Sequence, residues 1–426
     1  MKNKGIWITV SVFLVLGLII GGFSCKAPAP TVEPVKTLTI GATQYLTGPA
    51  APWGIPGRRS LELWRDIVNE QGGFTVGGET YKVETICYDD KAEVGQGMIA
   101  VRKLILEDEV DIIIGPQGMP ELSIAMNPLC TTEGVLHIVN DGSIGVLRPE
   151  WPTCFVASID TPDSLQATYL YVSEVHPEVK TVAIVGFDGF DDRLGMVYAY
   201  KGARDHGIEV VYYQTYPLET IDFFPLMTAV MKTNPDFIDM CEGYPEFTAA
   251  MIQAAYELGF EGLIDLSTPD YDLLSAKVPD EFVYEHIMVH YFANHWDSPE
   301  LPKACNEYHD RYVALYPEAG WIGSSQSCYP GGMMLEQGIA AADSVDPFEI
   351  AEALRNLTVI QHPLGEASWS GMELYGINQA LQIPRPIFEG RDGKMTVGKM
   401  FYPPFPWDYD ITGIPLSEEF IELMPK

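Results

Sequence analysis

Basic residues are scarce in this sequence. Its 426 residues include 26 lysines and arginines against 59 aspartates and glutamates, which gives a formal net charge of -33 and a pI near 4.4. A surface of this charge repels phosphate backbones and anionic lipid headgroups, so the composition excludes nucleic acid as a partner. The hydrophobic share of 47% is that of an ordinary globular protein, and the acidity alone identifies no ligand.

Signatures of catalysis and metal binding are also missing. Residues 141–145 (DGSIG) lack the first glycine of GxSxG, and there is no GxxxxGK(S/T), no HExxH and no GxGxxG opening a helix after the first strand. His290 and His295 are five residues apart, a spacing that does not favour joint metal ligation. We therefore expect no enzyme activity and no cofactor or metal.

Long apolar runs are limited to the N-terminus, where one stretch approaches the ~20 apolar residues that cross a bilayer. It covers residues 6–20, follows Lys2 and Lys4, and is followed by small residues and then Cys25. A basic start, an apolar core and a small residue at the cut are typical of a secretory signal. We interpret residues 1–24 as a lipoprotein signal peptide.

The cysteine at this junction indicates lipid attachment at Cys25, although Gly22 stands where lipoprotein signals usually carry leucine. The alternative is an uncleaved transmembrane anchor. Residues 25–36 are proline-rich, which predicts an extended tether between a membrane and a folded body. Both interpretations place that body outside the cytoplasm and attached to the membrane, either in the periplasm or at the outer face of the cytoplasmic membrane.

The other cysteines are few, and none has a CxxC or Cys/His spacing typical of a metal site. An oxidising compartment permits disulfides among them, but their pairing does not follow from the sequence. Buried thiols are the alternative. These residues are Cys87, Cys130, Cys154, Cys241, Cys305 and Cys328.

From residue 38 onward, short β-branched or apolar runs alternate with amphipathic helical stretches. Strands separated by helices of this length predict βαβ units, and the series restarts near residue 160. The predicted fold class is therefore α/β, with two lobes built on doubly wound parallel sheets. Ligands of such sheets bind at loops beyond the carboxyl ends of the strands. We expect these loops after residues 40, 114, 139, 185, 240 and 266.

Several short stretches, taken in order, resemble one known family. Over residues 38–400 the chain is similar to the branched-chain amino acid (Leu/Ile/Val-type) periplasmic binding proteins that serve ABC transporters. Each stretch alone is weak, but the ordered set is specific. The matching stretches are LTGP at 46–49, WG at 53–54, IVNE at 67–70, YDD at 88–90, IIGP at 113–116, EGY at 242–244 and DGK at 392–394.

This resemblance implies a type I periplasmic-binding-protein fold with a three-segment hinge. The crossings would lie near residues 156–160, 287–292 and 357–368. Two lobes of this kind close on a solute without changing it, and an ABC permease reads the closed state. The implied N-terminal lobe comprises residues 37–157 and 288–362, and the implied C-terminal lobe comprises residues 158–287 and 363–426.

The resemblance also implies ligand contacts from two loops of the first lobe, where the family holds a carboxylate with hydroxyl and backbone N–H groups. The first loop contributes Gln117, Gly118 and Met119, and Met119 replaces the usual serine with a side chain that cannot donate a hydrogen bond. The second loop contributes Asp141, Gly142 and Ser143. Asp141 adds an acid beside the expected carboxylate, and its alternative role is a helix N-cap or a turn residue.

Aromatic residues at three matched positions predict walls that cover the ligand: Trp53, Phe190 and Tyr244. The family's ammonium-binding acid falls near Asp270, whose alternative role is an N-cap, and Tyr271 is the alternative residue to face the ligand. No lysine or arginine falls at a matched position, which disfavours polyanions. We expect a small polar solute, with an amino acid first and an amide, urea-like or aromatic acid solute as the alternative.

A third interpretation is a sensor that presents the closed state to a membrane signalling partner.

Overall fold

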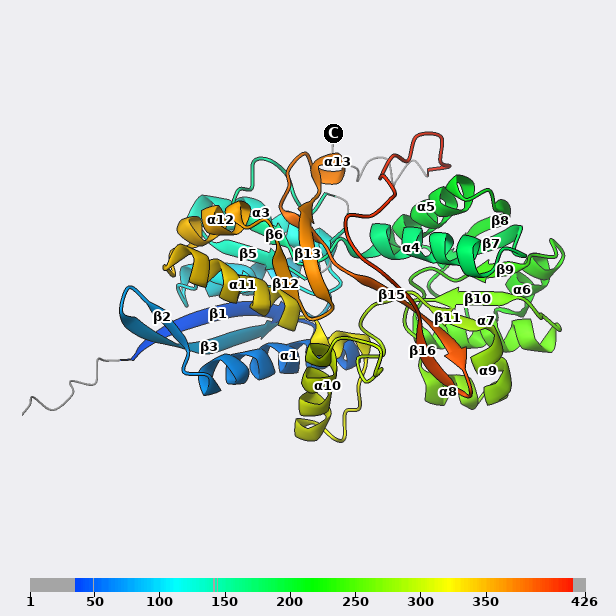
Figure 1. The fold of residues 1–426 in the computed structure, drawn as a ribbon, viewed down its shortest axis with the longest axis horizontal. Helices are drawn as coiled ribbons and strands as arrows, with labels where there is room; N and C mark the ends of the chain where they lie inside the picture. The colour runs from blue at the N-terminus through cyan, green and yellow to red at the C-terminus, as the bar shows by residue number, and fades with distance from the viewer. Residues whose placement is uncertain (1–34, 49, 141, 144, 417–426) are drawn as a thin grey trace, which may run out of the picture. The chain divides into compact units, whose positions relative to one another are not determined.

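The computed structural model describes residues 35–416 except residues 49, 141 and 144, together with the backbone but not the side chains of residues 190 and 191. The predicted signal peptide, Cys25 and Asp141 therefore lie outside the described residues. Within the described chain, two β-sheets are each covered by helices on both faces (Figure 1). None of the described helices combines the length and apolarity that a membrane span requires.

Nine strands of the described chain form the first sheet. Its central strands are parallel, while antiparallel strands lie at both edges. In spatial order the strands are β12 (Ile360–His362), β13 (Gly365–Ser370), β14 (Ala380–Gln382), β6 (Cys154–Val156), β5 (Leu136–Val139), β4 (Ile112–Ile114), β1 (Lys36–Gln44), β3 (Glu79–Asp89) and β2 (Phe74–Val76).

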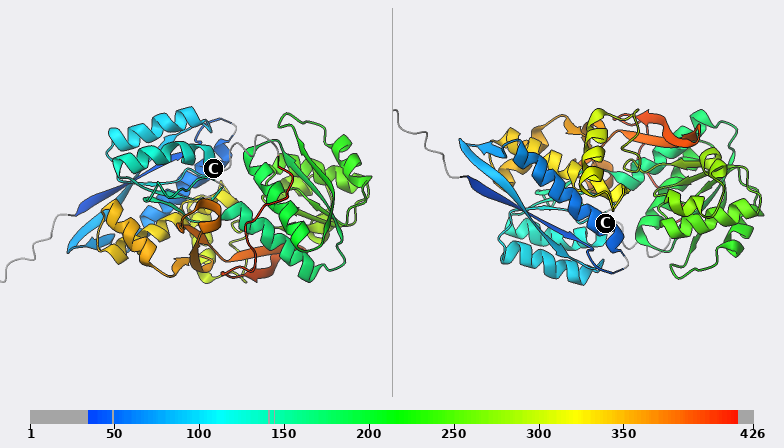
Figure 2. Two further views of the ribbon diagram at one scale, coloured as in Figure 1. Left: turned by 90° about the horizontal axis from the view of Figure 1, so that it is seen from above. Right: turned by 90° about the horizontal axis from the view of Figure 1, so that it is seen from below.

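Helices cover both faces of this sheet, with α2 and α3 on one side and α1, α11 and α12 on the other (Figure 2). The alternation of side chains along β4 shows why both faces are apolar. Ile113 packs with the α2 and α3 side chains, whereas Ile112 and Ile114 pack with those of α1 and α11. The helices that accompany this sheet are α1 (Ala51–Glu70), α2 (Val94–Leu106), α3 (Pro120–Glu133), α10 (Lys303–Leu315), the 3-10 helix η1 (Gly323–Gln326), α11 (Tyr329–Ala342), α12 (Pro347–Asn356) and α13 (Met372–Tyr375).

Seven strands of the described chain form the second sheet. Five of them are parallel to one another, and the two that come last in the sequence, β15 and β16, pair in antiparallel fashion. In spatial order they are β16 (Lys394–Phe401), β15 (Arg385–Arg391), β11 (Ile287–Val289), β10 (Leu263–Leu266), β9 (Phe237–Asp239), β7 (Thr181–Phe187) and β8 (Glu209–Tyr216). Its helices are α4 (Asp160–Val175), α5 (Phe190–Asp205), α6 (Phe224–Met231), α7 (Pro245–Glu257), α8 (Tyr271–Ser275) and α9 (Asp280–His286). We call the first sheet and its helices the N-terminal lobe, and the second sheet and its helices the C-terminal lobe.

The chain passes between the lobes after β6, after β11 and after β14. The third crossing lies between Gln382 and Arg385, later than the predicted residues 357–368. Those residues include β12 and part of β13, which belong to the first sheet. Residues 363–382 were therefore predicted in the wrong lobe. Short antiparallel strands have no βαβ periodicity, so no pattern in the sequence separated them from the second lobe.

The segment after β16, residues 402–416, connects elements of both lobes. The hydroxyl of Tyr409 donates to Asp163 Oδ1 in α4 at 2.7 Å and accepts from Gln382 Nε2 in β14 at 2.7 Å. Asp408 pairs with the buried Lys201 of α5 at 2.8 Å. The last described residues thus bind two helices of the C-terminal lobe to a strand of the N-terminal lobe.

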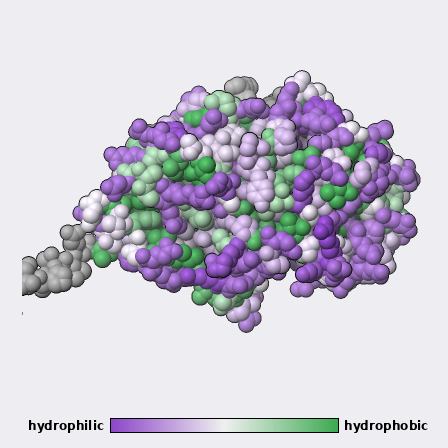
Figure 3. Space-filling view, in the orientation of Figure 1, coloured by the Kyte–Doolittle hydropathy of each residue, from purple (hydrophilic) through white to green (hydrophobic). Residues whose placement is uncertain are grey.

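Among the described residues, Cys87, Cys130, Cys154, Cys241 and Cys305 are free thiols, and all of them except Cys87 are buried, so the buried-thiol alternative applies to these four. Figure 3 shows a mainly hydrophilic face on which hydrophobic residues form scattered patches, as the acidic composition leads one to expect.

Candidate functional site

A cavity of about 490 Å³ is lined by residues that follow strand ends in both sheets. Tyr45 follows β1, Gln117 follows β4 and Ser143 follows β5 in the N-terminal lobe. Phe187 ends β7 and Glu242 follows β9 in the C-terminal lobe. The cavity therefore occupies the place where doubly wound sheets bind ligands, and its volume is in the usual range for small-molecule sites.

The N-terminal lobe supplies a close-packed loop after β4. Gly118 has φ +60° and comes so near to Tyr45 that a Cβ at this position would lie 2.7 Å from the tyrosine hydroxyl. Only glycine fits this backbone without strain. Met119 precedes α3 at the N-cap position, where its side chain caps nothing. Gln117, Gly118 and Met119, which we predicted as ligand contacts, all line the cavity.

Buried polar atoms without partners cluster on this side of the cavity. The side-chain oxygens Gln117 Oε1, Ser123 Oγ, Ser143 Oγ and Ser324 Oγ are buried and have no hydrogen-bond partner among the described residues. All four residues line the cavity. Buried polar groups are usually satisfied, and leaving one unsatisfied costs about 1–3 kcal/mol. Their accumulation beside one cavity indicates positions that a bound molecule can satisfy.

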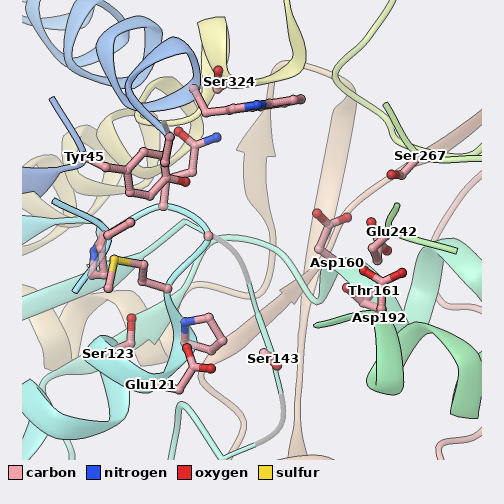
Figure 4. Close-up of a pocket in the computed structure, with 18 of the residues that line it drawn as sticks. Tyr45, Glu121, Ser123, Ser143, Asp160, Thr161, Asp192, Glu242, Ser267 and Ser324 are labelled. Carbon is pink, nitrogen blue, oxygen red and sulfur yellow. The ribbon is translucent and has the colours of Figure 1, made fainter. Parts of the chain in front are cut away.

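Carboxylates gather on the side of the C-terminal lobe. Figure 4 shows Asp160, Asp192 and Glu242 close together, opposite Tyr45 and Ser324. Asp160 begins α4 and Asp192 lies in the first turn of α5, where the helix dipole favours negative charge. Asp192 Oδ1 accepts the backbone N–H of Phe187 at 3.1 Å. We did not predict any of these acids as site residues.

Asp160 forms a buried ion pair with Arg385, the first residue of β15. The guanidinium is fully buried and donates to Asp160 Oδ1 at 2.7 Å and to Ser158 Oγ at 2.8 Å. It also donates to the carbonyl of Ile159. Burial raises the pKa of Asp160 above its usual value, and the positive charge of Arg385 opposes that rise. The pair joins the first crossing to the start of β15, directly behind the cavity wall.

Glu242 faces a second buried ionic group. His290 Nδ1 lies 2.7 Å from Asp265 Oδ2, and His290 Nε2 lies 3.6 Å from Glu242 Oε1. Burial favours the neutral imidazole, but the Asp265 carboxylate and then Glu242 raise the pKa of His290 well above its usual value. Since His290 directly follows β11, the second crossing carries an imidazole that lies beside a cavity residue.

Aromatic rings from both lobes form the remaining walls. Phe187 and Tyr244 stack with ring centroids 5.1 Å apart and planes inclined by 18°. Trp53 lies in the first turn of α1 rather than in the predicted loop, because α1 begins at Ala51 and tolerates a proline in its first turn. Tyr45 and Tyr291 also line the cavity. These rings provide apolar surface next to the carboxylates.

Most of the predicted site residues that the structure describes lie around this cavity. The predicted residues that line it are Trp53, Gln117, Gly118, Met119, Gly142, Ser143 and Tyr244. Asp141 and the side chain of Phe190 lie outside the described part of the chain.

Asp270 and Tyr271 are not among the lining residues. Asp270 caps α8 by accepting the N–H of Leu273 at 2.9 Å, and the Tyr271 hydroxyl lies 2.9 Å from His295 Nε2. Ser267 and Thr268 contribute the lining after β10 instead. The acid predicted after β10 thus has a local structural role, as its N-cap alternative stated. The acid after β9, Glu242, could have been found from the rule that ligands bind at loops beyond strand ends, since it lies in such a loop.

Comparisons with known proteins agree with this geometry. A family model described as periplasmic binding protein matches residues 37–374. The Leu/Ile/Val-binding protein homolog 3 of Brucella melitensis is 22% identical over 346 residues, which cover 78% of this chain and 87% of that protein.

Two solved structures share the fold. A solute-binding protein of an ABC transporter from R. palustris, in complex with 4-hydroxybenzoate, has a TM-score of 0.69 at 20% identity, over 87% of this chain and 99% of that chain. The branched-chain amino acid transporter substrate-binding protein LivJ from Streptococcus pneumoniae, in complex with isoleucine, has a TM-score of 0.70 at 18% identity, over 86% of this chain and 100% of that chain. The predicted fold class is confirmed.

Proposed function

Because this chain belongs to the periplasmic binding protein family, we propose that it is an extracytoplasmic solute-binding protein of an ABC importer. The observation that carries the proposal is the 490 Å³ cavity lined from both lobes, with unpaired polar atoms on one side and carboxylates on the other. A small polar solute that satisfies both sides is bound there. No chemical change of the solute is required, and a binding role is consistent with the solute-binding relatives.

The contacts favour an amino acid or a related amine. Asp192 and Glu242 accept its ammonium group, while the hydroxyls of Ser143 and Ser324 supply hydrogen bonds on the opposite side. Trp53 covers its apolar part. The relative with 4-hydroxybenzoate supports an aromatic acid as the second candidate, since several rings line this cavity.

Binding acts through the lobes. A solute that touches both lobes stabilises the arrangement that encloses it by its differential affinity for that state, and the permease subunits of the importer recognise the enclosed form. In this proposal, signal cleavage before Cys25 and acylation of its thiol hold the protein at the membrane through residues 25–36.

A thermal-shift screen of the purified protein against amino acids, amides and aromatic acids tests the proposal. A ligand that binds only the folded state stabilises it by about 2.7 kcal/mol at a concentration of about 100 times its Kd. We expect a raised melting temperature with at least one class of solute. No shift with any solute would contradict the function.

Aromatic variants then locate the site. Trp53→Ala and Tyr244→Ala are expected to weaken binding of the identified solute about tenfold or more, because each removes ring surface from the cavity wall. Tyr402→Ala is the matched control, since this exposed tyrosine lies outside the lining. Equal affinity in all three variants would remove the cavity as the binding site and leave the fold unaffected.

A further inference from the structure

The lining of the cavity has charge of one sign. Among the described lining residues, Glu121, Asp160, Asp192 and Glu242 are acidic and none is lysine, arginine or histidine. A buried carboxylate without compensation is costly, so such a lining disfavours any ligand whose bound part is anionic. The formal net charge of the whole chain, -33, attracts cations over a longer range.

Two basic side chains behind the wall, Arg385 and His290, already contact acids. Arg385 forms an ion pair with Asp160, in which Nη1 lies 2.7 Å from Oδ1. His290 is shared between Asp265, at 2.7 Å, and Glu242, at 3.6 Å. Two acidic side chains therefore share one imidazole, and Glu242, which has the longer contact, is the one that lines the cavity. Glu242 retains capacity for a further positive partner.

Acceptor atoms also predominate on the other side. Gln117 is 5% exposed, lines the cavity, and its Oε1, which can only accept hydrogen bonds, has no partner among the described residues. The buried hydroxyl oxygens of Ser143 and Ser324 lack partners as well. A ligand rich in N–H donors satisfies all of these groups, whereas a carboxylate ligand satisfies only the hydroxyls.

Aromatic rings in the cavity wall also favour a positively charged ligand. Phe187 and Tyr244 form a stacked pair on the same lobe as the acids, and Trp53 lies on the other lobe. Ring faces attract ammonium, guanidinium and quaternary ammonium groups within about 6 Å of the ring centroid. Carboxylates combined with several aromatic walls are therefore the chemistry that selects an organic cation.

We propose that the cavity takes a solute of net positive charge, namely an amine, a guanidine or a quaternary ammonium compound. Its charged group lies against Glu242 and Asp192, and its carbon skeleton lies between Trp53 and Tyr244. The proposal rests on the proposed solute-binding function and specifies its ligand class. It differs from a branched-chain amino acid site in needing no carboxylate on the ligand.

A charge series on one carbon skeleton tests this proposal: 3-methylbutylamine, leucine and 4-methylpentanoate, with agmatine, choline and 4-hydroxybenzoate added. Thermal shift identifies binders and calorimetry measures their affinity. We expect cations to bind about tenfold or more tightly than their zwitterionic or anionic counterparts, because only the cation meets no repulsion from the lining. Raising the salt from about 0.05 M to about 0.5 M weakens cation binding.

Glu242→Gln provides the residue-level test, with Glu246→Gln as the matched control. Glu246 loses the same charge four residues away but is exposed and outside the lining. We expect cation affinity to fall about tenfold in the first variant and less than about twofold in the second. Unchanged affinity in Glu242→Gln overturns the proposal.

The outcomes separate this proposal from the function on which it rests. The charge preference is overturned if leucine binds more tightly than 3-methylbutylamine, or if 4-hydroxybenzoate binds and no cation does. Either result leaves solute binding in place. If no compound of the series and no solute of the wider screen binds, both the charge preference and the solute-binding function are overturned. Binding of agmatine or choline alone supports a cation of a different skeleton.

Discussion

Replacing Arg385 with methionine removes the ion pair that joins the first crossing to β15. The guanidinium is fully buried and bonds Asp160, Ser158, Ser164 and the Ile159 carbonyl. Methionine fills much of the volume but leaves the Asp160 carboxylate buried without a cation. Breaking a buried pair in this way costs about 3–5 kcal/mol. We expect a loss of this size in the free energy of unfolding, measured by urea denaturation near pH 7.

The loss has a defined pH dependence. Burial already raises the pKa of Asp160 above its unfolded value while Arg385 opposes the rise, so removing Arg385 raises it further. A raised carboxyl pKa means that the folded state holds the proton more tightly, and stability is lost as pH rises through the folded pKa. The deficit of Arg385→Met is therefore smallest at acidic pH and grows toward neutral pH.

A second substitution and a control isolate the cause. The double variant Arg385→Met/Asp160→Asn removes the stranded charge and should recover about half of the loss. Arg311→Met removes a more exposed ion pair, with Glu70 at 2.6 Å, and should cost at most about 1 kcal/mol. The reasoning fails if Arg385→Met costs no more than Arg311→Met, or if Asp160→Asn brings no recovery.

Three further predictions use the same structure. Because its pKa is raised above the unfolded value near 6.5, His290 contributes stability that is full below that pH and is lost as pH rises through the folded pKa. The difference in the free energy of unfolding between wild type and His290→Gln should therefore shrink as pH rises above about 6.5, and a difference that does not change with pH would refute the raised pKa. Tyr409→Phe removes one donor and one acceptor between the lobes and should lower the free energy of unfolding by about 1–2 kcal/mol in urea, whereas an unchanged midpoint would show that the segment adds nothing. Burial raises the pKa of Cys130 to about 12, so iodoacetamide should leave this thiol unlabelled in the native protein and label it in denaturant without a reductant. If mass spectrometry shows labelling of Cys130 in denaturant only after a reductant is added, the residue forms a disulfide and the expectation is wrong.

The repeating part of the fold could be predicted because each strand and helix carries its own local signal. Residues 112–114 are three isoleucines, and such an apolar run between helical stretches is typical of a strand covered on both faces. The third crossing could not be placed by the same reasoning. β12 and β14 are three residues long and pair in antiparallel fashion, so they lack the helix that marks each βαβ unit.

The candidate site, like the fold, could be predicted from the sequence only in part. Gln117, Met119 and Ser143 could be selected because the resemblance marked the loops after β4 and β5, and strand ends of a parallel sheet meet at one edge. The buried ionic groups behind them depend on contacts across the chain: Arg385 and Asp160 are 225 residues apart in sequence. Asp270 was misplaced for a local reason, since its carboxylate caps the following helix. Sequence pattern distinguishes poorly between an acid that caps a helix and one that faces a cavity.

The pairing of β14 with β6 and of β15 with β11 determines when this protein can finish folding. A chain synthesised from its N-terminus makes β6 and β11 long before their partners, which lie in its last quarter. Neither lobe can complete its sheet as an independent unit, although domains generally fold as units during synthesis. Until then both sheets present unpaired strand edges, which are templates for aggregation. A chain that ends before residue 380 therefore lacks the strands that pair with β6 and β11, and both sheets depend on residues 380–391 for their completion.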